Sequence, residues 1–176
     1  MESYSDHVSR VRAGYKEARE RFAARLRQAS DADVHRVPPG GGWSAAQIGW
    51  HVATVDAFFA AALSGASPAA KPLADGERAR TWAEIVVTIP DRLEAGKRVQ
   101  PPDVVKRDEV LASLAESERN LDAALAALSE ARAADFAITH PVLGTVALGQ
   151  VGEWATAHVI RHNAQAKRVL AEIAAT

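Results

Sequence analysis

The chain has 176 residues, enough for one domain, and its 48% hydrophobic and 24% charged residues are typical of a globular protein. Positive and negative side chains nearly balance, at 21 and 22, so the sequence has no overall electrostatic signature of nucleic-acid or anionic-membrane binding. There is no cysteine, which excludes disulfides, thiolate metal ligands and a cysteine nucleophile. The polar N-terminus, and the lack of an apolar run near the ~20 residues of a membrane span, predict a cytoplasmic protein without a membrane partner.

Residues 6–29 are predicted to form a first amphipathic helix. Its apolar side chains recur three and four residues apart, at Val8, Val11, Tyr15, Ala18, Phe22 and Leu26. The helix must end before the turn-forming stretch DADVHRVPPGGG. His35 lies in that stretch, where we expect a solvated side chain with no special role.

A second helix is predicted to begin at Ser44, because Ser44 followed by Gln47 forms a capping-box pattern. Gly65 stands where a glycine commonly ends a helix. The predicted inner face consists of Ile48, His51, Val52, Val55, Phe58, Phe59 and Ala62. Trp50 and Asp56 fall to the side of this stripe.

Residues 64–107 form a long connection that prolines divide into pieces, at Pro68, Pro72, Pro90, Pro101 and Pro102. Only residues 81–89 and 91–99 are compatible with short helices. A crossover of this length in a compact domain often covers a functional site, but it can also be a simple strap across the bundle. The sequence does not separate these two interpretations.

A third helix follows Pro102, with a stripe of Leu111, Leu114, Leu121, Leu125 and Leu128. Its register places Glu118 on the apolar stripe. That carboxylate could face a metal site, but we favour a wide stripe whose edge lets the carboxylate reach solvent. Residues 135–148 are predicted to be a link, and His140, which precedes a proline, is expected to be a loop residue and not a ligand.

The last helix carries two histidines where the helical pattern requires core residues. Its inner face consists of Val151, Trp154, His158, His162, Gln165, Val169 and Ile173. At a spacing of four residues, His158 and His162 have Cβ atoms roughly 6 Å apart on one face, which lets both imidazoles reach one metal ion. His51, also on a predicted inner face, is the candidate for a third ligand.

These elements predict an all-α fold, a single four-helix bundle over residues 1–176. The long crossover between the second and third helices makes those two helices parallel, in an up-down-down-up order. No strand-like alternation of comparable length competes with the helical pattern.

The cost of burying several polar groups together favours a metal at these histidines. A lone inward histidine is usually satisfied by one hydrogen bond, and a pair at this spacing also arises by chance. Three inward imidazoles on facing helices leave several nitrogens without water, at about 1–3 kcal/mol for each unpaired group. One divalent ion would satisfy all three, so His51, His158 and His162 are the predicted metal ligands.

These residues carry a family resemblance. The chain resembles the DinB-like (DinB/YfiT) superfamily of four-helix-bundle proteins, over most of residues 6–174. The resemblance lies in a W-S-x-x-Q-x-x-x-H start of the second helix, an H-x-x-x-H-x-x-Q pattern in the last helix, the proline-rich link and the HPVLG segment. The matching residues are Trp43, Ser44, Gln47, His51, His158, His162 and Gln165. The resemblance implies that the three histidines bind one divalent metal below a pocket shaped by the proline-rich arm. It also implies that the relatives include thiol-dependent transferases and isomerases, which use mycothiol or bacillithiol.

Three neutral ligands leave at least one coordination position open, as in catalytic sites. A metal-dependent transferase with a thiol cofactor, or a hydrolase, is therefore expected to act on a small-molecule substrate. The alternative is a noncatalytic, stress-related protein that binds a metal or ligand, with the ion sealed between helices. Zinc or nickel is the first expectation for the metal, with iron or manganese as alternatives. A homodimer is also expected, because apolar residues cluster in the crossover at Trp82, Ile85, Val86, Val87 and Ile89.

Overall fold

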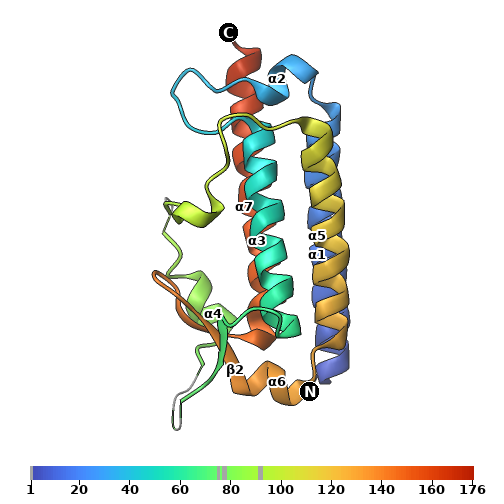
Figure 1. Ribbon diagram of the computed structural model, residues 1–176, viewed down its shortest axis with the longest axis vertical. Coiled ribbons are helices and arrows are strands. Elements are labelled where there is room, and N and C mark those ends of the chain that lie inside the picture. The colour runs from blue at the N-terminus through green and yellow to red at the C-terminus, as the bar shows by residue number, and fades with distance from the viewer. Residues whose placement is uncertain (1, 75, 77–78, 91–92) are drawn as a thin grey trace.

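Four long helices make up most of this computed structural model, which describes residues 2–74, 76, 79–90 and 93–176. They are α1 (Tyr4–Gln28), α3 (Ala45–Ser64), α5 (Arg107–Ala127) and α7 (Val151–Ala174). Figure 1 shows them side by side along the long axis of the molecule. The expectation of a mostly helical fold is therefore confirmed.

Each long helix packs mainly against two others, α1 against α5 and α7, and α3 against the same two, with a smaller contact between α1 and α3. The Tyr4 hydroxyl at the start of α1 donates to the Leu128 carbonyl just after α5, so these helices run in opposite directions. The helices α3 and α5 approach closely near their starts, where Gly49 faces Val110. In Figure 1 both of these helices run downward, whereas α7 runs upward. This packing places the middle of α3 beside the middle of α7.

The predicted ends of α3 are confirmed by local hydrogen bonds. The Ser44 hydroxyl accepts from the Gln47 amide, and the Gln47 side chain accepts from the Ser44 amide, which completes the capping box. Gly65 ends the helix with a φ of 83°, a left-handed conformation that glycine adopts without a steric penalty. The first helix starts slightly earlier than predicted, because the Ser3 hydroxyl caps it.

Short helical segments connect the long helices. They are α2 (Asp31–His35), α4 (Trp82–Val86), α6 (Glu130–Asp135) and the 3-10 turns η1 (Lys97–Val99) and η2 (Leu148–Gln150). The predicted helix at 81–89 forms in its first part, where Thr81 and Glu84 make a capping box. Of the predicted helix at 91–99, residues 91–92 lie outside the described part of the chain, and the remainder contains only η1.

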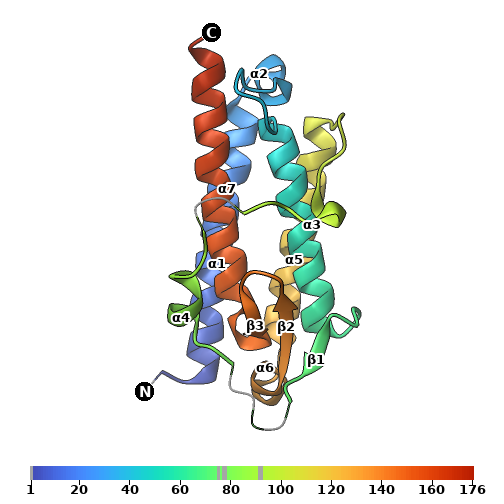
Figure 2. The same ribbon diagram turned by 90° about the vertical axis from the view of Figure 1, so that its left-hand side faces the viewer.

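A small antiparallel sheet at one end of the bundle is an exception to the predicted all-α fold, and two of its strands lie in the predicted link at residues 135–148. Its strands are β1 (Ala70–Pro72), β2 (Phe136–His140) and β3 (Gly144–Ala147), in the order β1-β2-β3. Ile138 of β2 pairs with Ala70 on one side and Val146 on the other. Strands of three to five residues are too short to show a clear alternation, which is why the sequence pattern missed them. Figure 2 shows the sheet against the lower part of the bundle.

The core of the bundle contains a buried polar network that corrects the placement of Asp56. This residue was expected at the side of α3, but it is fully buried, as is Arg19 of α1 at 2% exposure. The Tyr15 hydroxyl donates to Oδ2 of Asp56 at 2.7 Å, and Nε of Arg19 lies 3.4 Å from the same oxygen. Burial raises the pKa of Asp56 to about 6, against the opposing effects of Arg19 and Tyr15. A hydrophobicity pattern cannot identify positions that are buried as an ion pair.

One further expectation about a helix face is wrong. Phe58, predicted on the inner face of α3, is 38% exposed. On α5 the buried position beside Leu114 and Leu121 is Ser117, at 3% exposure, while Glu118 is half-buried next to it. The negative charge of Glu118 contributes to the raised pKa of Asp56. Glu118 therefore lies near the buried polar network.

Within the described residues, no helix combines the length and the apolar character that crossing a membrane requires.

Candidate metal centre

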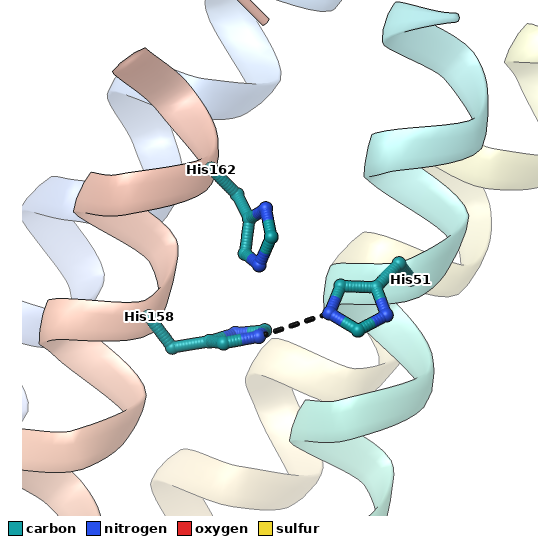
Figure 3. Close-up of side chains that lie close together, drawn as sticks. All are labelled: His51, His158 and His162. Carbon is teal, nitrogen blue, oxygen red and sulfur yellow. Dashed lines mark hydrogen bonds between the residues drawn. The ribbon is translucent and has the colours of Figure 1, made fainter. Parts of the chain in front are cut away.

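The structure brings together the three histidines that the sequence singled out. His51 comes from α3, and His158 and His162 project from successive turns of α7 toward it, as Figure 3 shows. The ring centroids lie 5.1 Å apart for His51 and His158, 4.7 Å for His51 and His162, and 4.4 Å for the two α7 residues. One nitrogen of each ring lies within 4.8 Å of the others. Three imidazoles from two helices therefore converge on one point.

His51 is fixed by contacts on both ring nitrogens. Its Nδ1 donates to the Val99 carbonyl of η1 at 2.7 Å, and its Nε2 lies 3.1 Å from Nε2 of His158. The ring also packs against Trp43, with 5.1 Å between ring centroids, and the residue is only 4% exposed. Because Nδ1 holds the proton, the Nε2 lone pair of the neutral ring faces the other histidines.

His162 is oriented in the same way by a side chain of its own helix. Its Nδ1 donates to Oε1 of Gln165 at 2.8 Å, which leaves the Nε2 lone pair free to face the cluster. Burial, followed by the effect of His51, lowers the pKa of His162 to about 4. The ring is therefore neutral at physiological pH.

His158 differs from the other two because its second nitrogen has no protein partner. Its Nδ1 is buried and, within the described residues, makes no hydrogen bond. Burial and the neighbouring His162 and His51 hold the pKa of His158 well below its ordinary value. Burial also lowers the pKa of His51, so all three rings are neutral near pH 7.

Three neutral imidazoles are a donor set that fits a divalent transition metal or zinc. Imidazole is a good ligand for these ions, whereas calcium and magnesium prefer oxygen. In the described residues the cluster contains no carboxylate, and Glu118 is not part of it. The hydrogen bonds from Nδ1 of His51 and His162 resemble the outer contacts that usually orient metal-binding histidines.

The crossover contacts this cluster directly. Val99 of η1 provides the carbonyl that holds His51, and Nη1 of Arg161 donates to the Pro90 carbonyl at 2.9 Å, which attaches the crossover to α7. In Figure 2, η1 lies beside α3. The sequence left open whether this segment covers a site or only straps the bundle, and its contact with His51 favours a role in the site.

His35 and His140 lie outside the cluster. His35 is not simply solvated, because its Nε2 accepts from the Arg107 amide at 3.2 Å and its Nδ1 donates to the Asp31 carbonyl at 2.7 Å. His140 lies at the end of β2, and its Nδ1 accepts from the amides of Val142 and Leu143. Both histidines connect backbone segments.

Two cavities on the surface of the bundle are lined by residues other than the histidines. One, of about 340 Å³, lies between α3 and α5 beside Trp50 and Glu116. The other, of about 280 Å³, lies between α1 and α7 beside Trp82. The histidines are nevertheless not sealed from solvent, since His158 and His162 are both partly exposed.

The sequence could not assign the outer contacts of the cluster. Gln165 was placed on the inner face of its helix, and its spacing of three residues from His162 was the available signal for their contact. The Val99 contact uses a backbone carbonyl, which any residue provides, so no sequence signal existed.

Comparison with known proteins gives a family and a fold. The family model of the DinB superfamily matches residues 15–166. A crystal structure of a conserved protein from Enterococcus faecalis is similar to this chain with a TM-score of 0.66 and 19% sequence identity, over 96% of this chain and 97% of that one. At this identity the likeness concerns the fold alone. No curated protein matches the chain.

Proposed function

Since the chain belongs to the DinB superfamily, we propose that it binds one divalent metal ion through His51, His158 and His162 and uses that ion in catalysis. The observation that carries the proposal is the convergence of one nitrogen from each histidine within 4.8 Å. The neutral state of the three rings supports it, because a metal competes poorly with protons on charged histidines. We expect zinc or nickel first, with iron or manganese as alternatives.

The protein's own residues would bind and orient the ion. Val99 and Gln165 hold the Nδ1 protons of His51 and His162, so that both Nε2 lone pairs face the cluster. Three neutral ligands would leave the charge of a divalent ion uncompensated and would leave room for a further ligand. The ion would supply the means to acidify a bound water or to bind a thiol as thiolate.

Two classes of reaction are compatible with a nucleophile that does not come from a cysteine or a serine side chain. The chain has no cysteine, and among the described residues no serine hydroxyl is hydrogen-bonded to a histidine ring. A nucleophile must therefore come from water or from a low-molecular-weight thiol, which corresponds to a hydrolase or to a thiol-dependent transferase. Both reactions would act on a small-molecule substrate.

A noncatalytic metal-binding protein is the second candidate. The observation behind it is that two cavities between the long helices, of about 340 and 280 Å³, are lined by residues other than the histidines. In that case the ion would mainly join α3 to α7, and the protein would become more stable on loading without any reaction.

The first experiment is a metal analysis of protein purified without a histidine tag. Replacing His51, His158 or His162 with Ala should lower the metal content sharply, because each change removes one of three ligands. His7→Ala is the matched control, since His7 lies on the outside of α1 beside Glu2 and Arg10. Full metal occupancy in the His158→Ala variant would overturn the assignment of the ligands.

The second experiment asks which chemistry the open position supports. The cobalt-loaded protein is titrated with small thiols, and a sulfur-to-metal charge-transfer band is expected if a thiolate binds. Thiol binding should release a proton and therefore strengthen as the pH rises, until hydroxide competes. If no band appears while cobalt stays bound, the transferase class is rejected and the hydrolytic or noncatalytic class remains.

A further inference from the structure

The hydrogen bond between Gln165 and His162 is the most specific outer contact of the histidine cluster. Both residues lie on α7, three positions apart, so the helix itself sets their separation. Oε1 of Gln165 lies 2.8 Å from Nδ1 of His162, and Gln165 is half-buried. The contact needs no other element of the fold.

The orientation of the Gln165 amide decides which nitrogen of His162 carries the proton. With Oε1 toward the ring, the amide accepts from Nδ1–H, and Nε2 keeps its lone pair toward His51 and His158. The opposite orientation would present the amide NH2 to Nδ1 and move the proton to Nε2, where it would block a metal. Only the first orientation is compatible with a cation at the cluster.

We propose that Gln165 is a positioning residue of the three-histidine centre, which holds His162 in the Nδ1-protonated tautomer and keeps its Nε2 available as a ligand. The proposal rests on the proposed metal-binding function. In this role Gln165 accepts the Nδ1 proton of His162, as the Val99 carbonyl accepts that of His51. Outer partners of this kind typically change metal affinity 10- to 100-fold when they are removed.

Gln165 is the better of the two partners for a test, because a side chain can be replaced and a backbone carbonyl cannot. Gln165→Leu keeps nearly the same size and removes the acceptor. Gln165→Glu keeps an acceptor of the same reach and makes it stronger. The matched control is Gln28→Leu, the same chemical change at the exposed last residue of α1.

The first measurement uses the metal-free protein, so that it does not depend on metal binding. Nitrogen-15 NMR of the ring nitrogens of His162 should show the proton on Nδ1 in the wild type and in Gln165→Glu. In Gln165→Leu this preference should be lost. Circular dichroism confirms that each variant keeps its helical content.

The second measurement is cobalt affinity, by competition with a chelator at pH 8. We expect a 10- to 100-fold loss in Gln165→Leu, with affinity at or above wild type in Gln165→Glu and unchanged in Gln28→Leu. A Gln165→Leu protein with wild-type tautomer and wild-type affinity overturns the role of Gln165 alone. A wild type that binds no metal overturns the proposed function itself, so the two failures are distinct.

Discussion

The close approach of α3 to α1 and α5 at Gly49 allows a quantitative test of the bundle. A Cβ atom at this position would lie 2.7 Å from Cγ1 of Val110 and 2.8 Å from Cδ1 of Leu26. Carbon atoms pack best at about 3.5–4.0 Å, so Gly49→Ala must displace both neighbours. Val110 is β-branched and resists a change of rotamer, which makes the adjustment costly.

The expected magnitude is the difference between two effects. Alanine is about 1 kcal/mol better than glycine in a helix interior, while an extra methyl group in a packed core costs about 1–3 kcal/mol. Gly14→Ala in α1 is the matched control, because no atom lies within 4 Å of its Cβ position. It should therefore stabilise the protein by up to about 1 kcal/mol.

The free energy of unfolding of both variants is measured by urea denaturation of the metal-free protein. We expect Gly49→Ala to be less stable than Gly14→Ala by about 1–3 kcal/mol, which isolates the packing cost because both variants gain the same helix propensity. Equal stability of the two variants would refute the close packing of α3 against α1 and α5.

Three other predictions concern the buried carboxylate, the crossover and self-association. The pKa of Asp56 is raised from 3.8 to about 6 in the folded protein, so ionisation of Asp56 opposes folding. The stability of the wild type should therefore fall relative to that of Asp56→Asn by about 3 kcal/mol as the pH rises from about 4 to above 6. A pH-independent difference between the two proteins in urea denaturation would contradict this. The His51→Ala substitution removes the hydrogen bond to Val99 and should accelerate tryptic cleavage after the exposed Arg98, as measured by mass spectrometry. An unchanged cleavage rate would show that this hydrogen bond does not hold the crossover. We also expect a homodimer through bundle faces, because Val87 of the crossover is 80% exposed and adds apolar surface. Light scattering that gives the mass of one chain at micromolar concentration would exclude it.

The parts of the fold that could be predicted are those fixed by local chemistry. The start of α3 at Ser44 depends only on Ser44 and Gln47, and its end depends on the left-handed conformation at Gly65. The inward direction of His158 and His162 follows from helical spacing alone. These signals are complete within a few neighbouring residues, so the sequence contains them.

The parts that could not be predicted require partners far apart in the chain. Asp56 is buried because Arg19 and Tyr15 of α1 meet it in the core, and nothing near Asp56 in the sequence indicates this. The sheet pairs Ala70 with Ile138, and each strand alone is too short to be recognised. The convergence of His51 with the α7 histidines was an inference from three inward faces, and only the packing of α3 against α7 brings the rings together.

The three histidines of the proposed metal centre differ in the partners of their ring nitrogens, so they are not expected to be equivalent as ligands. His51 and His162 donate Nδ1–H to Val99 and Gln165, so their Nε2 lone pairs are available without rearrangement. Nε2 of His158 lies 3.1 Å from the accepting Nε2 of His51 and therefore carries a proton. Binding a cation through that nitrogen requires the proton to move to Nδ1, which is buried and has no acceptor in the described part of the chain. An unpaired buried donor costs about 1–3 kcal/mol, so in the proposed metal centre His158 is expected to be the least favourable of the three ligands, and an acceptor added beside its Nδ1 is expected to raise the metal affinity.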